Sequence, residues 1–256
     1  MLSHHTTSGT GRAVVLIHGN SLDRRTWNGQ ITDPALAHLQ LRALDLPGHG
    51  NSPWYPPERN YTLEELAMDV AAQLDGLDAP LLVGHSLGGH IALRVLALAP
   101  HVSGLVLSGT PPLSSAADFA HAFLPHPALA NAFKADLSRE EALALANAWT
   151  WQGSLYTMSL RDTILNTDPR VRQGIGNQLA AGDIKDEHAM IHASRIPVSM
   201  VHGTDDPFIP CSYLEALAPA LFAGGKVRYI RDAGHCAQLQ EPSTFNSLLA
   251  EFERSL

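Results

Sequence analysis

Short, continuous runs of apolar residues recur along the chain, and each one ends at glycine, proline or a polar residue. A strand that is covered on both faces must be apolar on both faces, so continuous runs predict buried strands of a parallel sheet. Six such strands are predicted, at residues 13–17, 39–44, 80–83, 104–107, 198–201 and 226–230.

Helical patterns lie between these runs. Capping boxes, in which a hydroxyl and a glutamate satisfy each other's free backbone amides, start at Thr62 and Ser138. Further helices are predicted at 87–99, from Pro169 onward, and at 242–254. Alternating strands and helices predict an α/β fold with a mostly parallel, doubly wound sheet and right-handed crossovers.

One long stretch departs from this alternation. Between residues 111 and 195 the pattern contains helical segments and no convincing strand. We expect residues 1–110 and 196–256 to form the α/β core, and residues 111–195 to form a helical cap inserted between two core strands and standing over the carboxyl edge of the sheet.

Composition limits the partners. The 256 residues carry a net charge of −8 with no basic run, which excludes a nucleic-acid backbone as a partner. No apolar stretch is long enough to span a membrane, and the start of the chain lacks the pattern of a signal peptide. Because the chain has only two cysteines and no signal-peptide pattern, the expected location is cytoplasmic. The expected oligomeric state is a monomer or a homodimer.

The candidate nucleophile is Ser86, in the sequence Gly84-His85-Ser86-Leu87-Gly88 between a predicted strand and a predicted helix. A sharp strand-to-helix turn crowds the backbone, and glycines two residues before and after the serine relieve that crowding. The helix behind the serine offers free amides and a positive dipole end to a developing oxyanion.

A serine hydroxyl needs a base within hydrogen-bond reach, and in this architecture the chain order is serine, acid, histidine. Among 14 histidines, His235 follows the last predicted strand, from which it can reach back to Ser86. The acid should follow the preceding strand, where Asp205 and Asp206 compete. We predict that Asp206 is the acid and that Asp205 is a turn residue.

The oxyanion hole needs two amides. Leu87 supplies one, and Asn20, in the loop after the first parallel strand, supplies the other, with its side chain free to touch substrate. His85 and His90 are interpreted as packing residues. Aromatic side chains of the predicted cap are candidates for lining an apolar substrate pocket, namely Phe119, Phe123, Trp149, Trp151 and Tyr156.

Five motifs together resemble the α/β-hydrolase superfamily across essentially the whole chain: HGN, DLPGHGNS, GHSLGG, HGTDDPFIP and DAGH. Within it, the stretches LIHGNS, LDLPGHGNS, SLGGHIAL and GLVLSGTPP resemble the metal-independent N-acyl-homoserine lactonases. The resemblance implies a serine triad under a small helical cap, with no metal or cofactor. It places the acid at Asp206 and the HGN asparagine at Asn20, and it suggests Asn147 as the counterpart of a substrate-contacting tyrosine.

We therefore expect hydrolysis of a small carboxylic ester or lactone through an acyl-enzyme, with an N-acyl-homoserine lactone as the favoured substrate. Two alternatives stay open: a small-acyl carboxylesterase, and a C–C bond or enol-lactone hydrolase of aromatic degradation. A non-catalytic receptor on the same fold is disfavoured because all three triad positions are filled.

Overall fold

The computed structural model describes residues 2–150 and 154–256. Its seven strands form one sheet in the order β1-β3-β2-β4-β5-β6-β7, parallel except for the antiparallel pair of β1 and β3. The strands are β1 (His4–Thr6), β2 (Ala13–Ile17), β3 (Gln40–Leu44), β4 (Leu81–His85), β5 (Gly104–Ser108), β6 (Val198–Gly203) and β7 (Val227–Ile230).

The predicted α/β-hydrolase fold class is confirmed, and each of the six predicted strands overlaps an observed one. The seventh strand, β1, was not predicted, because its sequence contains no apolar run. It has only three residues, His-His-Thr, and pairs along one edge of the sheet, with His4 opposite Leu44. An edge strand of this kind is not covered on both faces, so it does not need apolar side chains.

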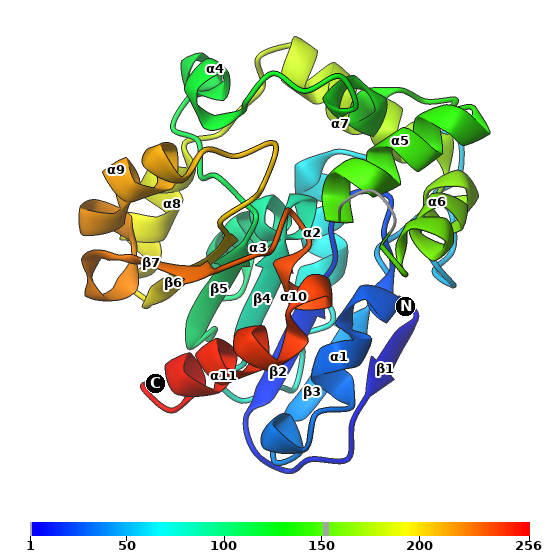
Figure 1. The fold of residues 1–256 in the computed structure, drawn as a ribbon. Coiled ribbons are helices and arrows are strands. Elements are labelled where there is room, and N and C mark those ends of the chain that lie inside the picture. The colour runs from blue at the N-terminus through cyan, green and yellow to red at the C-terminus, as the bar shows by residue number, and fades with distance from the viewer. Residues whose placement is uncertain (1, 151–153) are drawn as a thin grey trace.

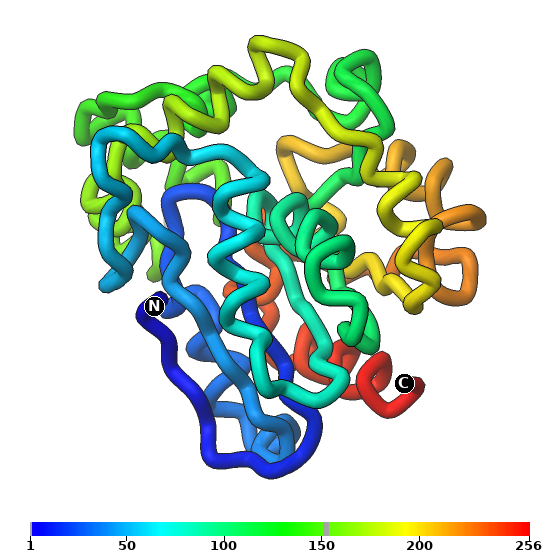
Figure 2. The backbone as a smooth tube through the Cα atoms, turned by 180° about the vertical axis from the view of Figure 1, so that it is seen from behind, coloured from blue at the N-terminus to red at the C-terminus, as the bar shows by residue number. Residues whose placement is uncertain are grey.

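Helices cover both faces of the sheet. Successive strand residues point to opposite faces, so Val15 and Ile17 belong to one core cluster, whereas Val14 and Leu16 belong to the other. The first cluster includes residues of α2 (Leu63–Ala71), α3 (Leu87–Leu98), α8 (Glu187–Ser194) and α9 (Cys211–Leu221). The second includes residues of α10 (Ala237–Gln240) and α11 (Pro242–Glu253), and α1 (Asn28–Ile31) packs against it through Ile31. Figure 2 shows α2 and α3, in cyan and blue-green, in front of the strands.

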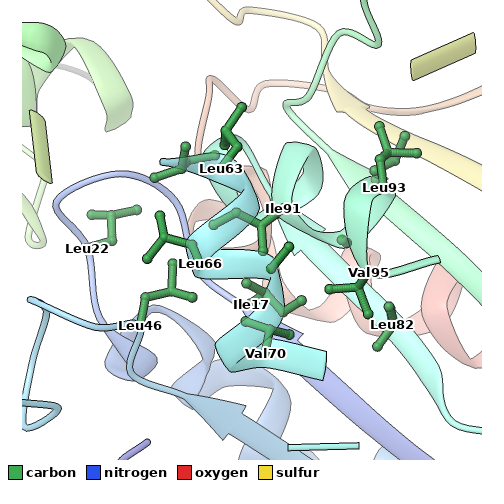
Figure 3. Close-up of a cluster of buried hydrophobic side chains, with 14 of the residues drawn as sticks. Ile17, Leu22, Leu46, Leu63, Leu66, Val70, Leu82, Ile91, Leu93 and Val95 are labelled. Carbon is green, nitrogen blue, oxygen red and sulfur yellow. The ribbon is translucent and has the colours of Figure 1, made fainter. Parts of the chain in front are cut away.

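The helix α2 shows how the apolar stripe works. Leu63, Leu66 and Val70 are buried, and Figure 3 shows them on the side of α2 that faces Ile17 and α3. The predicted capping box at its start forms only in part. The Glu65 amide donates to the Thr62 hydroxyl at 3.2 Å, whereas the Glu65 carboxylate binds Arg59 instead.

Between β5 and β6 the described residues form helices and no strand. They include α4 (Phe119–Ala122), the 3₁₀ segment η4 (Leu129–Phe133), α5 (Arg139–Thr150), α6 (Thr157–Asn166) and α7 (Pro169–Ala180), followed by α8. Figure 1 shows α4, α5, α6 and α7 gathered at one end of the sheet, whereas α8 lies beside α9. The predicted helix starts are present: Ser138 and Glu141 exchange both capping-box hydrogen bonds, and α7 begins at Pro169. In the described part of the chain, no helix has the length and apolarity needed to cross a bilayer.

Candidate active site

Ser86 occupies a strained turn between β4 and α3. Its backbone angles are φ 51° and ψ −119°, which a side-chain-bearing residue adopts only where the surroundings enforce it. Here the Ser86 amide donates to the Ser108 carbonyl at 2.8 Å, and the Thr110 hydroxyl donates to the Ser86 carbonyl at 2.9 Å. A Cβ on Gly88 would lie 2.3 Å from the Ile17 carbonyl oxygen, so the turn also requires a glycine there.

His235 and Asp206 form a buried pair at the same edge of the sheet. The Nδ1–H of His235 donates to Asp206 Oδ2 at 2.8 Å, and both side chains are almost fully buried. Asp206 Oδ1 accepts the backbone amide of Phe208 at 2.8 Å. Burial raises the pKa of Asp206, but the charge and hydrogen bond of His235 outweigh that effect, and the net pKa lies below its usual value. The carboxylate is therefore ionised at neutral pH.

The neighbouring aspartate points elsewhere. Asp205 is exposed, and its carboxylate accepts a hydrogen bond from the Thr204 hydroxyl at 3.2 Å. The structure thus directs one of the two competing carboxylates, that of Asp206, to the His235 ring. Asp232, which precedes His235 in the same loop, is also exposed.

His85 supports the loop that carries His235. Its Nε2–H donates to the His235 carbonyl at 3.0 Å, and the two ring centroids lie 5.0 Å apart. Burial lowers the pKa of His85 to about 3, with a further contribution from His235, so the ring is neutral. Gly109, at φ 54°, lets its own backbone pass close to the His235 ring, because a Cβ on Gly109 would lie 3.2 Å from His235 Nδ1.

The predicted oxyanion residues lie beside Ser86. Leu87 is the first residue of α3, where the backbone amide has no acceptor within the helix. Asn20 follows β2, and among the described residues its amide has no acceptor either. The expectation of a free Asn20 side chain is wrong. Its Nδ2 donates to the Ala132 carbonyl of η4 at 2.6 Å, and its Oδ1 accepts from the Ser21 hydroxyl at 3.1 Å.

A largely apolar cavity of about 90 Å³ joins these residues. Ser86, Leu87, His235 and Asn20 line one part of it. Its apolar walls come mainly from the helical segment between β5 and β6, and include Leu113, Phe119, Phe123, Leu129, Ala132, Phe133, Trp149, Ile175, Leu179 and Ile184. The cavity therefore lies between the carboxyl edge of the sheet and the helices above it.

The predicted substrate-contacting residues fare unequally. Asn20 and Trp149 line the cavity, as do Phe119 and Phe123. Asn147 is not among the lining residues found in the described chain. Two positions along α5 correspond to a rotation of about 200°, so the helix that turns Trp149 inward carries Asn147 away.

Tyr156 does not line this cavity either. Its side chain is 39% exposed and borders a different hollow, next to Leu160 of α6. It stands just before α6 begins at Thr157, outside the wall that faces Ser86. Trp151, the remaining predicted contact, lies outside the described residues.

Several hydrogen bonds connect the candidate site to the helices above it, and two of them involve the Asn20 and His235 loops. One is the bond from Asn20 to Ala132 of η4. The other runs from the amide of Cys236, next to His235, to the carbonyl of Trp149 at the end of α5, at 3.0 Å.

Sequence reasoning missed a cluster of charged groups on the cavity wall. His90 and Arg94 of α3 and Glu187 of α8 all line the cavity and contact one another. His90 had been interpreted as a packing residue. The missing signal was spatial, since 97 residues separate His90 from Glu187 and Glu187 lies outside every motif.

The chain matches the alpha/beta hydrolase family over residues 14–248, and it belongs to that family. The dihydrolipoyllysine-residue acetyltransferase component of the acetoin cleaving system of Cupriavidus necator is 30% identical over 94% of this chain, which spans 63% of the length of that relative. The pimeloyl-[acyl-carrier protein] methyl ester esterase of Aromatoleum aromaticum is 29% identical, with 94% of this chain and 98% of the relative covered.

Among solved structures, the resemblance to lactonases is confirmed. A mutant of the N-acyl homoserine lactonase AidH complexed with N-hexanoyl homoserine lactone superposes with a TM-score of 0.90 at 27% identity, covering 99% of this chain and 93% of that one. The esterase RhEst1 from Rhodococcus sp. ECU1013 gives a TM-score of 0.81 at 26% identity, covering 100% and 95%.

Proposed function

We propose that this protein hydrolyses a small carboxylic ester or lactone through an acyl-enzyme. In this proposal Ser86 is the nucleophile, His235 the general base and Asp206 the acid that orients the base. The observation that carries it is the convergence on one cavity of the strained Ser86 turn and the His235 ring, whose Nδ1 is bound by Asp206 at 2.8 Å.

The steps follow from these positions. His235 Nε2 takes the proton of the Ser86 hydroxyl as its oxygen attacks the carbonyl carbon, and Asp206 stabilises the imidazolium that forms. The amides of Asn20 and Leu87 hold the oxyanion of the tetrahedral intermediate. The intermediate collapses to the acyl-enzyme as His235 returns the proton to the leaving alkoxide. His235 then activates a water molecule that releases the acid.

The favoured substrate is an N-acyl-homoserine lactone. With a lactone, the leaving alcohol stays on the acyl group after the ring opens. Support comes from the likeness to AidH and from the apolar walls of the cavity, which suit an acyl chain. A small-acyl carboxylesterase is the second candidate, supported by the likeness to RhEst1 and to the methyl ester esterases.

Residues 111–195 are proposed to serve as the cap over a core of residues 1–110 and 196–256. The support is the origin of the cavity wall, which is built largely from this segment. Within this segment, α8 differs from the other helices. It packs on α3 of the core, and the chain returns from it to the sheet. A cytoplasmic location and a monomeric or homodimeric state stay predictions.

The test is incubation of purified protein with C4 to C12 acyl-homoserine lactones in the presence of EDTA, with acid release followed by titration. We expect turnover by the wild type and none by Ser86→Ala. Fast hydrolysis of p-nitrophenyl esters without lactone turnover would select the carboxylesterase. Turnover that EDTA abolishes would contradict the serine mechanism.

A further inference from the structure

The charged cluster on the cavity wall is built around Glu187. Its carboxylate is nearly fully buried and accepts from His90 Nδ1 at 2.9 Å, from Arg94 Nη1 at 2.7 Å and from the Leu113 amide at 3.0 Å. Burial raises the pKa of Glu187, but the charges of His90 and Arg94 outweigh it, so the net pKa is below its usual value. An ionised carboxylate is thus fixed behind His90, and ester hydrolysis by Ser86 does not use it.

The other charged groups near His90 are paired with one another. Arg94 binds Glu64 at 3.0 Å as well as Glu187, so two carboxylates flank one guanidinium. Asp183, the other acidic residue on the cavity wall, is paired with Lys185 at 2.8 Å. With Nδ1–H donated to Glu187, the other ring nitrogen of His90, Nε2, has no partner among the described residues.

The position of His90 relates this nitrogen to the substrate. Ser86, Leu87, His90 and Arg94 lie along the face of α3 that borders the cavity. His90 is four residues beyond Ser86, which is about one helical turn and about 6 Å along the axis. A group attached to Ser86 that extends along this face would therefore reach His90 a few bonds beyond the carbonyl that is attacked. The surrounding wall is largely apolar, so an unpaired polar nitrogen there is costly until a ligand supplies a partner.

We propose that His90 is a specificity-determining residue, which forms a hydrogen bond through Nε2 with an amide group carried by the acyl group. Glu187 is the positioning residue that fixes the ring. This inference rests on the proposed attachment of the acyl group to Ser86. An N-acylated amino lactone has an amide group at that place, whereas a plain alkyl lactone or ester has none.

The test uses two activated esters of equal length, p-nitrophenyl N-hexanoylglycinate and p-nitrophenyl nonanoate. The ratio of their kcat/KM values is divided by the ratio of their hydroxide-catalysed rates, which removes the intrinsic difference in reactivity. We expect the wild type to favour the amide-bearing ester about tenfold after this correction, which corresponds to about one additional hydrogen bond. His90→Leu should bring the corrected ratio to about one.

Two variants keep the test decisive. His192→Leu, at an exposed position of α8, should retain the wild-type ratio. His90→Gln keeps an N–H donor and should retain part of the preference. A wild-type ratio near one, or a ratio that His90→Leu leaves unchanged, overturns the inference. The esters contain no lactone ring, so a failure to open lactones would contradict the favoured substrate while leaving this test intact.

Discussion

Asp206 holds His235 with one carboxylate oxygen and is itself held by the other. Oδ2 accepts from the imidazole at 2.8 Å, and Oδ1 accepts from the backbone amides of Phe208 at 2.8 Å and Ile209 at 3.3 Å. Partners on both oxygens thus fix the plane of the carboxylate, and with it the orientation of the ring that borders the cavity.

Asp206→Asn should lower kcat by about 10⁴, because an amide in place of the carboxylate leaves the histidine in the wrong tautomer. Asp205→Asn is the matched control. That carboxylate is exposed and, among the described residues, is hydrogen-bonded only to Thr204, so its replacement should cost less than about threefold. Steady-state kinetics with one activated ester measures both, and a larger loss in the Asp205 variant would refute the assignment.

Ser86→Ala should lower kcat by about 10⁶, since the nucleophile acts as a unit with its base. An organophosphonate should label the wild type at Ser86, as peptide mass mapping after proteolysis would reveal. The variant should remain unlabelled while keeping the same circular dichroism spectrum. A label on another serine would disprove this role.

The free energy of unfolding should decrease as the pH falls, because His85 is buried in its neutral form. Its pKa is lowered from the ordinary 6.5 to about 3 in the folded protein, so below pH 6.5 the unfolded chain binds a proton that the folded chain does not. This contribution is complete above pH 6.5 and is lost at up to about 1.4 kcal/mol per pH unit as the pH falls toward 3.

His85→Gln should therefore flatten the pH dependence of the unfolding free energy by about one proton, measured by urea denaturation between pH 7 and pH 5. The exposed His192 provides the control, and His192→Gln should leave the slope unchanged. Equal slopes in the His85 variant and the wild type would contradict the burial argument.

Arg172 should matter for stability although it has no carboxylate partner in the described part of the chain. Its guanidinium donates to the carbonyls of Lys134, Ala135 and Ile164 and to the hydroxyl of Ser21, at 2.6 to 3.1 Å.

Arg172→Met should cost at least about 2 kcal/mol, because several buried acceptors lose their donor at once. Arg139→Met, at an exposed position in the first turn of α5, should cost less than about 0.5 kcal/mol. Urea denaturation of both variants checks the difference, and similar midpoints would show that the network is dispensable.

The sequence was most informative where local backbone geometry restricts residue type. The glycines around Ser86 and the continuous apolar strands express such restrictions, so the turn and six strands could be predicted. The edge strand β1 could not, since pairing along one edge demands no apolar residue. The sequence favours Asp206 over Asp205 through the family resemblance, whereas the structure separates the two directly, because Asp206 is buried and Asp205 is exposed.

Contacts between distant segments were beyond prediction. The His90–Glu187 pair joins two helices, and Glu187 lies outside every motif of the sequence. Asn147 and Tyr156 were selected from a stretch whose helical phase was unknown. Once α5 is seen to turn Ala142, Leu145, Ala146 and Trp149 inward, Asn147 no longer faces the cavity.

The bonds from Asn20 to Ala132 and from Cys236 to Trp149 carry a mechanical consequence. Each ties one half of the proposed machinery, the oxyanion loop or the His235 loop, to the overlying helices. Moving those helices away to admit a substrate would strain both hydrogen bonds. The oxyanion loop and the His235 loop would then lose their catalytic arrangement in the open protein. Substrate entry and nucleophilic attack would then occur in two successive states of the protein, and the second would be reached only after the helices had closed.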